Sequence, residues 1–445
     1  MWLSLSYPDP KPNLPVFLYA MPGVVMAMPL IPVIVIIPAY YADNLSLGLA
    51  QTGLVLLMAR ILDFFTDPVV GWATENSQRR YANARKIQIG IGAGITGFAL
   101  FQLFTPSVGV GSFYLFFWYS LMLFGWTVIQ VPYLAWVVDL TGQYEKRVSY
   151  NAAREFSGIV GILILGAYLA FAAEQPVSGQ LRGSAELILF LGLAAFPFLF
   201  FLRSSRKKIS TKLRLSALKT LRKNRLFLRL MLAWFLNSMS IGVATACFPL
   251  FVKYGLGLEE STGTYLLFLY FSAAILGMPI WYYLCRIYGK HSVWGYAMII
   301  ACLAFLVVPF LSTGSVVLFG LVCLVTGITV GADLVIPPSI QADVADWDTY
   351  STGEDRASLL FSLWSMVSKL ALGVGAGSAY IILGQPETSA DTAEVSTALD
   401  LLLLSVIYAV VPIVLKVSSV AIMWRFPLDA RKHNVIRNRL ERRAG

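Results

Sequence analysis

Long apolar segments separated by short polar ones run through the whole chain. A membrane-spanning helix needs about 20 mostly apolar residues, and twelve segments meet that length. We predict helices near residues 14–41, 47–73, 87–105, 112–139, 149–173, 186–203, 229–253, 262–284, 292–311, 315–341, 357–383 and 399–424. Polar loops are expected at Glu174–Glu186 and Gln385–Ala398. The pattern predicts an all-α integral membrane protein with twelve transmembrane helices.

The basic residues sort by side of the membrane. With the N-terminus placed inside, the inner segments hold 28 of the 34 Lys and Arg residues, and the outer segments hold only Arg182 and Lys253. Cytoplasmic segments of membrane proteins carry such an excess, so we expect both termini in the cytoplasm and the chain in the cell (inner or plasma) membrane. The chain has a net charge of +10. Because its basic residues border the membrane, where anionic lipid attracts them, we expect no nucleic-acid partner.

A long basic segment, Arg203 to Arg229, divides the twelve helices into six and six. The expected units are residues 1–202, a cytoplasmic linker 203–229, residues 230–424 and a basic cytoplasmic tail 425–445. Four residues of the first half recur in the second with one shift of 211 positions: Pro38, Leu45, Leu47 and Pro68 recur as Pro249, Leu256, Leu258 and Pro279. Related halves are typical of transporter folds.

Composition narrows the chemistry. Hydrophobic residues make up 58% and charged residues 13% of the chain, and its four Cys and two His residues show no ligand spacing. Neither a phosphate-binding loop nor a hydrolase or zinc-protease motif occurs, so we expect neither an enzyme nor a cofactor. We also expect no cleaved signal peptide. The pairs Gly90/Gly94 and Gly373/Gly377 have the spacing that lets helices approach closely.

The second predicted helix carries the most informative residues, Arg60, Asp63, Thr66 and Asp67. Spacings of three and four put Arg60, Asp63 and Asp67 on one helix face. Ionisable groups inside a membrane are costly and usually functional, and carboxylates suit a hard cation. A Na⁺ site therefore competes with two alternatives. The carboxylates could share a proton, or Arg60 could pair structurally with Asp63 while Asp67 caps a helix break at Pro68.

Other polar residues in apolar segments are candidates for solute contact or pairing. Thr127 and Gln130 share a face of the fourth predicted helix, within its stretch Trp126 to Tyr133. Gln130 suits a hydroxylated solute, and an interhelical contact is the alternative. Arg154 could face a cavity or pair with a carboxylate. Lys369 is a plausible partner for Asp63 or Asp67 across the two halves. Asp333 is an unexplained buried carboxylate, and we expect Lys416 to extend its amine toward the interface.

At these residues the chain resembles the glycoside–pentoside–hexuronide:cation symporter family of the major facilitator superfamily. The resemblance covers nearly the whole chain and rests on three ordered blocks. They are Arg60-x-x-Asp63-x-x-x-Asp67-Pro68-x-x-Gly71 with Arg79, Arg80 and Arg85; Val131-Pro132-Tyr133 with Arg147 and Arg154; and Ala342-Asp343-Val344-x-Asp346-Trp347-Asp348 with Thr352-Gly353, Arg356 and Lys369.

The resemblance implies a major facilitator fold of two six-helix bundles. It implies a cation site at Asp63, Asp67 and Thr127, to which we add Thr66, at a position where the family commonly has asparagine. Lys369 and Arg154 match family residues of helices eleven and five. The expected solute-binding residues are Trp126, Gln130, Tyr133, Arg154 and Lys369. The expected coupling and gate residues are Arg60, Arg79, Arg80, Asp343, Asp346 and Arg356.

Two departures bear on the solute. The sugar permeases carry aspartates where this chain has Ala27 and Gln130, and the first helix is an apolar wall of Met and Pro residues. We predict a monomeric secondary transporter that couples Na⁺ or H⁺ to symport of a small organic solute, a sugar or glycoside, with membrane lipid as its surroundings. A proton-coupled exporter and a carrier of lipids or amphiphiles are alternatives on the same fold. A membrane enzyme or scramblase is the alternative from another class.

Overall fold

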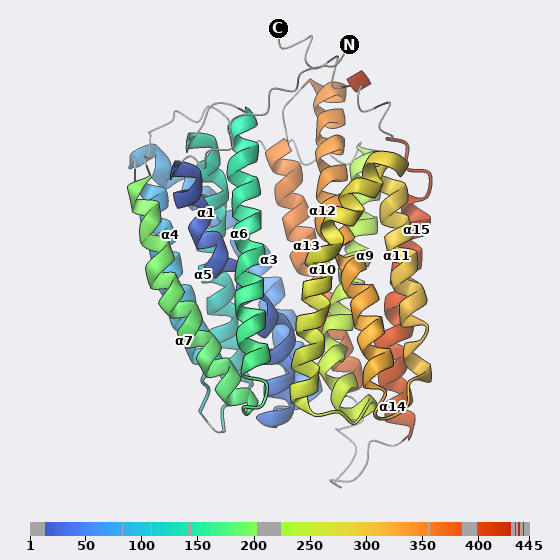
Figure 1. Ribbon diagram of the computed structural model, residues 1–445. Helices are drawn as coiled ribbons and strands as arrows, with labels where there is room; N and C mark the ends of the chain where they lie inside the picture. Colours follow the sequence, from blue (N-terminus) through green and yellow to red (C-terminus); the bar gives the residue numbers. More distant parts are fainter. Residues whose placement is uncertain are drawn as a thin grey trace.

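The computed structural model describes residues 14–81, 83–107, 109–140, 144–202, 224–353, 357–384 and 398–428, with four further residues beyond. These residues form helices and no strands, and the helices make two bundles side by side (Figure 1). The first contains α1 (Leu14–Ala27), α2 (Ile37–Ala39), α3 (Leu49–Arg80), α4 (Ala84–Phe104), α5 (Ser112–Leu140), α6 (Tyr144–Phe171) and α7 (Val177–Ala195). The second contains α9 (Arg225–Leu250), α10 (Glu260–Tyr288), α11 (Lys290–Phe305), α12 (Val316–Thr352), α13 (Ala357–Leu383), α14 (Ala398–Ser405) and α15 (Val411–Met423).

Short π-helical and 3₁₀ turns extend several of these helices into single spanning segments. The π-helical turns are η1 (Pro32–Ile36), η2 (Tyr40–Asn44), η4 (Phe251–Gly255) and η7 (Val406–Val410), and the 3₁₀ turns are η3 (Phe196–Phe201) and η5 (Val308–Phe310). Eleven described segments are long and apolar enough to cross a membrane. The charged helix α3, with 32 residues, is not among them. It lies between α5 of its own bundle and α13 of the other, which cover its polar face.

The sequence repeat is also visible in the helix boundaries. Tyr40–Asn44 and Phe251–Gly255 are both π-helical, and the two stretches are 211 residues apart. The following helices begin at Leu49 and Glu260, with the same shift. A proline stands two residues before each π-helical turn, and its missing N–H disturbs the regular α-helical hydrogen bonds there. The two halves therefore share their local irregularities, as duplication predicts.

Some predicted boundaries are wrong. α7 begins at Val177, inside the predicted polar loop, where Arg182 and Glu186 are exposed and pair one turn apart at 3.0 Å. α3 continues through Pro68 to Arg80, so no helix break exists for Asp67 to cap. α9 begins at Arg225, inside the predicted linker. Residues 203–223 of the linker, most of the predicted loop Gln385–Ala398 and most of the predicted tail lie outside the described residues.

Glycine contacts sharpen the picture of helix packing. A Cβ on Gly377 of α13 would lie 3.1 Å from the Gly53 carbonyl oxygen of α3, so the predicted close approach at Gly373/Gly377 is confirmed. The same prediction is wrong for Gly90/Gly94, because a Cβ on Gly94 would meet nothing within 4 Å. The close contact of α4 with α5 uses Gly92 instead, where a Cβ would lie 2.9 Å from the Ile129 backbone nitrogen.

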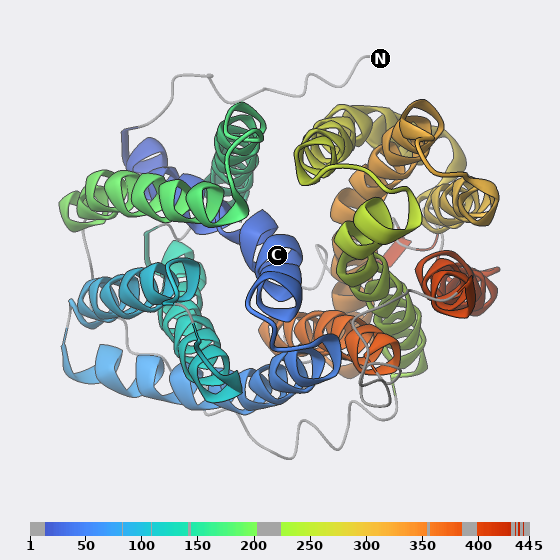
Figure 2. The same ribbon diagram turned by 90° about the horizontal axis from the view of Figure 1, so that it is seen from below.

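The two bundles meet along two helix pairs, α3 with α13 and α6 with α10 (Figures 1 and 2). We call the end where α1 begins and α15 ends the termini end, and the end where η2 and η4 lie the far end. At the far end η1 and α2 also pack against α9. Asp43 of η2 forms an ion pair with Lys253 of η4 and accepts a hydrogen bond of 2.8 Å from the Tyr254 hydroxyl.

Candidate functional site

The predicted carboxylates lie on the face of α3 that is turned toward α5 and α13. Asp63 is 3% exposed, and the Asp67 side chain is partly accessible. The opposite face of α3 carries Phe65, Val69 and Trp72, which are all exposed on the outside of the bundle. The spacing of four residues between the aspartates therefore places both carboxylates together on the protected side of the helix.

Thr127 of α5 joins the two carboxylates. Its hydroxyl lies 2.8 Å from Oδ1 of Asp67 and 3.2 Å from Oδ1 of Asp63. The family resemblance implied that Asp63, Asp67 and Thr127 form one site. Thr127 is at least 60 positions from either aspartate in the sequence, and the structure brings the three side chains together. Thr66, the fourth predicted ligand, is placed differently. Its hydroxyl donates to the Asp63 carbonyl oxygen of its own helix at 2.9 Å.

Lys369 reaches this oxygen cluster from the other bundle. Its Nζ lies 2.9 Å from each carboxylate oxygen of Asp67, 3.3 Å from the Thr127 hydroxyl and 3.5 Å from Oδ2 of Asp63. The predicted pairing of Lys369 with the aspartates across the halves is confirmed. A primary ammonium therefore lies at the centre of an oxygen-rich site built by α3 and α5.

Arg60 borders the same site. Its Nη1 lies 3.9 Å from Oδ2 of Asp63, and its Nη2 lies 3.3 Å from the Tyr119 hydroxyl. Gly373, one turn after Lys369 on α13, leaves room for the aliphatic stem of Arg60, since a Cβ there would lie 2.5 Å from Cγ of Arg60. Two carboxylates thus face two cationic side chains, and among the described residues Oδ2 of Asp63 accepts no hydrogen bond.

The predicted solute contacts on α5 separate into two kinds. Trp126 and Gln130 are half-buried. Tyr133 is fully buried, its ring stacks on Tyr19 of α1 at 4.6 Å, and the two residues exchange hydroxyl-to-carbonyl hydrogen bonds of 2.5 and 2.9 Å. These contacts hold Tyr133 in the core between α1 and α5, where its hydroxyl donates to the Tyr19 carbonyl oxygen rather than to a solute.

Arg154 of α6 packs beside α1. It forms an ion pair with its sequence neighbour Glu155, although adjacent helix positions need not pair. Its side chain is mostly buried, whereas that of Glu155 is 71% exposed. The backbone carbonyl of Arg154 lies against Gly23 of α1. Of the two predictions for Arg154, pairing with a carboxylate is confirmed, with Glu155 as the partner, and solute contact stays a prediction.

Three of the predicted coupling and gate residues, Arg80, Asp343 and Asp346, lie at the termini end, whereas Arg60 borders the cation site. Asp343 of α12 pairs with Lys290 of α11 at 2.6 Å, within one bundle. Asp346 is half-buried on the same helix, and Arg80 is exposed at the end of α3. The side chain of Arg79 and all of Arg356 lie outside the described residues. The assignment of these residues to a gate stays a prediction.

The comparison with protein families decides the class. Residues 18–430 match the family described as MFS/sugar transport protein, which covers most of the chain. The chain belongs to the MFS/sugar transport protein family. It is therefore an integral membrane transporter of the major facilitator fold, with a small-molecule solute, and not an enzyme. The predicted fold class and family are confirmed.

Relatives of this chain are named for several different solutes. The glucuronide carrier protein homolog of Escherichia coli (strain K12) is 21% identical, covering 89% of each chain. The isoprimeverose transporter of Lactiplantibacillus pentosus is 22% identical, covering 86% of this chain and 82% of that protein. The sodium-dependent lysophosphatidylcholine symporter 1-A of Danio rerio is 22% identical, covering 90% of this chain and 83% of that protein.

Solved structures support the fold. The D-xylose-proton symporter superimposes with a TM-score of 0.67 at 12% identity, covering 93% of this chain and 97% of that chain. The nucleoside transporter NupG gives a TM-score of 0.64 at 14% identity, covering 93% of this chain and 99% of the other. At these identities the likeness describes the arrangement of helices and not the solute.

The sequence analysis did not predict a polar cluster that lies inside the second bundle. Lys416 does not extend toward the interface, because it is 5% exposed and lies 3.4 Å from Oδ2 of Asp333. Its Nζ also donates to Asn237 at 2.7 Å. The signal was available, since a buried lysine and a buried aspartate in one half are natural partners.

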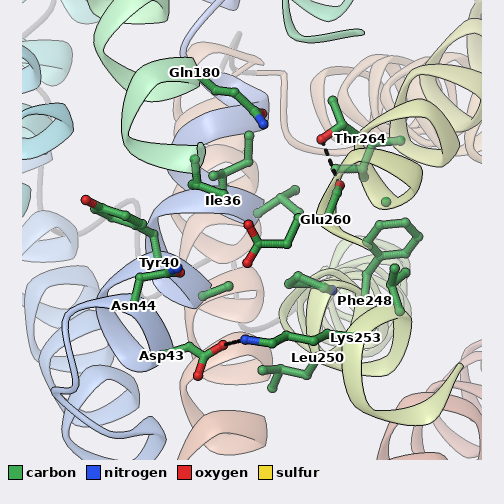
Figure 3. A pocket seen from close by; sticks show the side chains of 17 residues that line it. Ile36, Tyr40, Asp43, Asn44, Gln180, Phe248, Leu250, Lys253, Glu260 and Thr264 are labelled. Atoms are coloured by element: carbon green, nitrogen blue, oxygen red, sulfur yellow. Dashed lines mark hydrogen bonds and ion pairs between the residues drawn. The ribbon is translucent and has the colours of Figure 1, made fainter. Parts of the chain in front are cut away.

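A pocket at the far end was also not expected. It lies between the two bundles and is lined mainly by apolar side chains, with Asp43, Lys253 and Glu260 among the polar ones (Figure 3). The Glu260 carboxylate extends into this pocket, whereas Asp43 and Lys253 point toward one another at its edge (Figure 3). The pocket is therefore apolar on its walls and charged on one side.

Proposed function

We propose that this transporter couples a cation, held by Asp63, Asp67 and Thr127, to symport of its solute. The observation that carries the proposal is the position of the Lys369 ammonium, 2.9 Å from both oxygens of Asp67 and close to Thr127. An ammonium and Na⁺ have the same charge and both prefer oxygen partners. The protein's own lysine thus occupies the place that a free cation would take.

Exchange between Lys369 and the cation supplies a coupling mechanism. Lys369 belongs to the second bundle, and the carboxylates belong to the first. Two carboxylates in a membrane interior are costly without a nearby positive charge. When a cation enters, Lys369 is released, and one contact that holds the bundles together is lost. Coupling requires such a difference in cation affinity between conformations.

The ligand chemistry favours Na⁺ over H⁺. Na⁺ needs several oxygens, by extension of the rules for other hard cations, and the site offers two carboxylates and a hydroxyl within hydrogen-bond reach of one another. A proton needs only one carboxylate oxygen, so the neutral Thr127 oxygen would be unnecessary. The names of three relatives include sodium dependence. Proton coupling remains the alternative that the experiments below separate.

A sugar or glycoside is the solute class we propose. Two relatives are named for a glucuronide and for isoprimeverose. Gln130 stands half-buried on α5, three residues after Thr127 on the same helix, and can both donate and accept hydrogen bonds. Its neutral amide suits hydroxyl groups without demanding a charged solute. Trp126 adds a ring surface of the kind that packs against a sugar or an aglycone.

An amphiphile is the second candidate solute, and the far-end pocket favours it. The pocket combines apolar walls with charged groups at one side (Figure 3). That combination suits a molecule with a hydrocarbon part and a polar head. Three relatives are named for lysophosphatidylcholine. A soluble glycoside would have less use for the apolar walls.

We further propose that the termini end faces the cytoplasm of a cell membrane and that the transporter acts as a monomer. The basic residues at helix ends support this orientation, because they gather at the termini end. They include Arg80 at the end of α3, Arg225 at the start of α9 and Lys290 at the start of α11. Contacts between the bundles then close the outer side in this conformation.

Proteoliposomes test the proposed function. The purified transporter is assayed for uptake of labelled glycosides and lysolipids under an imposed Na⁺ or H⁺ gradient. Asp67→Ala should abolish the stimulation by the gradient, because the site loses both carboxylate oxygens of Asp67, the two that lie nearest to Lys369. Glu186→Gln, which removes an exposed carboxylate on α7, is the control and should keep full stimulation. Stimulation that persists in Asp67→Ala would refute the site.

A further inference from the structure

The buried charges of the second bundle have no part in the proposed cation site. Asp333 of α12 and Lys416 of α15 are both 5% exposed, and Lys416 also contacts Asn237 of α9. A buried ion pair contributes little net stability compared with well-packed apolar residues of similar size. Buried charged residues inside a membrane protein are therefore usually kept for function.

A line of contacts connects this pair to the helix that carries Lys369. Oδ1 of Asp333 accepts a hydrogen bond of 2.7 Å from Nε1 of Trp294 on α11. The Trp294 ring lies 6.3 Å from the ring of Trp234 on α9. Nε1 of Trp234 in turn donates to the Ser368 hydroxyl on α13 at 2.5 Å. Ser368 directly precedes Lys369 in the chain.

A second contact fixes the same part of α13. The ring of Trp234 stacks on that of Trp364 at 4.6 Å with an angle of 16°. Trp364 lies one turn before Ser368, whose hydroxyl donates to the Trp364 carbonyl oxygen at 2.8 Å. Trp234 therefore holds α13 by one hydrogen bond and one stacked ring, immediately before the residue that reaches across to the first bundle.

We propose that the Asp333–Lys416 pair positions Lys369, acting through Trp294, Trp234 and Ser368. The pair orients Trp294, the two tryptophans pack together, and Trp234 sets the rotation of α13 that points Lys369 at Asp67. Asp333, Lys416, Trp294 and Trp234 are positioning residues, because none of them touches the cation site itself. The inference rests on the proposed function only in that Lys369 is the group the cation displaces.

Lysine labelling measures the position of Lys369 without any solute or cation. The purified full-length transporter is treated with a small amine-reactive reagent in Na⁺-free buffer, and mass spectrometry follows labelling of Lys369 relative to Lys253. Trp234→Phe removes the bond to Ser368 and keeps an aromatic ring. Loss of one hydrogen bond should raise the labelling rate of Lys369 about five-fold. Asp67→Asn, which removes the charge that holds Lys369, marks the upper end of the scale.

Trp281→Phe is the matched control. Trp281 is buried in the same bundle, and its Nε1 donates to the Ile328 carbonyl oxygen of α12 at 2.6 Å rather than to α13. It should leave the labelling of Lys369 unchanged. The double variant Asp333→Asn with Lys416→Met removes both buried charges together and should raise labelling as Trp234→Phe does. Combined with Trp234→Phe it should add little, because the residues act in sequence.

The outcomes separate the positioning role from the cation site. Unchanged Lys369 labelling in Trp234→Phe, in protein that elutes and unfolds like the wild type, overturns the positioning role. Na⁺ added to the wild type should accelerate Lys369 labelling by displacing the ammonium. Altered labelling in Trp234→Phe without any effect of Na⁺ or acid would leave the positioning role standing and overturn the cation site.

Discussion

Helices α3 and α10 occupy equivalent places in the two bundles, yet the charged residues in the middle of α3 have no charged counterpart at the same positions of α10. Arg60, Asp63 and Asp67 of α3 correspond, with the shift of 211 residues, to Phe271, Ala274 and Met278 of α10. α3 packs against α13 through an ion cluster, whereas α10 packs against α6 through apolar contacts such as Phe268 on Gly166. The two halves share their scaffold, and the proposed coupling site lies at one of the two interfaces between them.

This contrast suggests how the two interfaces divide the work. Among the described residues, the α6–α10 contact is apolar where Phe268 meets Gly166, so its stability should not depend on ions. The α3–α13 interface contains Lys369 between two carboxylates, so its stability should change when a cation enters. If only one of the two interfaces is sensitive to the cation, the bundles can move when the cation binds while the other interface keeps them in contact.

The largest effect is expected from placing the charge on the wrong helix. Ala274→Asp puts a carboxylate at a site that is 2% exposed and lies on an apolar face. An unpaired buried charge should destabilise the fold by about 3–5 kcal/mol, which thermal unfolding of the purified transporter will show. Ala274→Asn, of the same shape but uncharged, should cost less. Equal losses for both variants would mean that size, not charge, distinguishes α10 from α3.

The next effect concerns the tethered cation. Lys369→Gln removes the ammonium that competes for the aspartates, so Na⁺ should bind about ten-fold more tightly. Accumulation driven by a Na⁺ gradient should nevertheless fall, because cation binding no longer releases a contact between bundles. Binding of labelled Na⁺ to the purified protein measures the first effect. Lys290→Gln, which disrupts the Asp343 pair at the termini end, is the control and should leave Na⁺ affinity unchanged.

Sequence reasoning predicted the scaffold and the acidic pair but not the buried network of the second bundle. Apolar length identifies spanning segments because a membrane leaves few other options for the backbone, and helical spacing placed Asp63 and Asp67 together. Considered alone, Lys416 is expected to extend its amine toward the membrane interface. Its partner Asp333 is 83 positions earlier, and the structure brings the two within 3.4 Å of one another.

Residue identity alone could not tell which polar side chains bond to other groups of the protein and which remain able to bind a solute or cation. Tyr133 and Gln130 lie one turn apart on α5, and both are typical of solute contacts. The structure commits the Tyr133 hydroxyl to Tyr19 of α1. Thr66 and Thr127 show the same difference, because one hydroxyl bonds within α3 and the other joins the carboxylates. The partners of Tyr133 and Thr127 come from helix pairings that the sequence does not state.

A smaller effect separates Na⁺ from H⁺. Thr127→Val keeps the side-chain shape and removes the hydroxyl that lies 2.8 Å from Asp67. Loss of one oxygen ligand should weaken Na⁺ binding about five-fold and leave any H⁺-driven uptake nearly unchanged. Thr66→Val is the matched control on α3, since its hydroxyl already bonds to the Asp63 carbonyl. Equal weakening in both variants would contradict the assignment of Thr127 as the ligand.

The smallest effect is expected at the far end, where equivalent elements of the two bundles meet. Asp43 of η2 contacts Tyr254 of η4, which is 211 residues away and therefore its own counterpart in the repeat. Asp43→Asn removes the ion pair with Lys253, and partly exposed pairs contribute about 0.2–1 kcal/mol. The far end should open somewhat more often, by a factor of up to about five.

Thiol labelling can detect this shift. A cysteine introduced at Ala39, which lines the far-end pocket, would react faster in Asp43→Asn than in the parent protein. The parent should lack its four native cysteines. Exchanging the charges, Asp43→Lys with Lys253→Asp, should restore slow labelling if the ion pair itself closes this end. Fast labelling in the exchanged variant would instead assign the closure to the apolar contacts of η1 and α2 with α9, which leave the charges only a minor role.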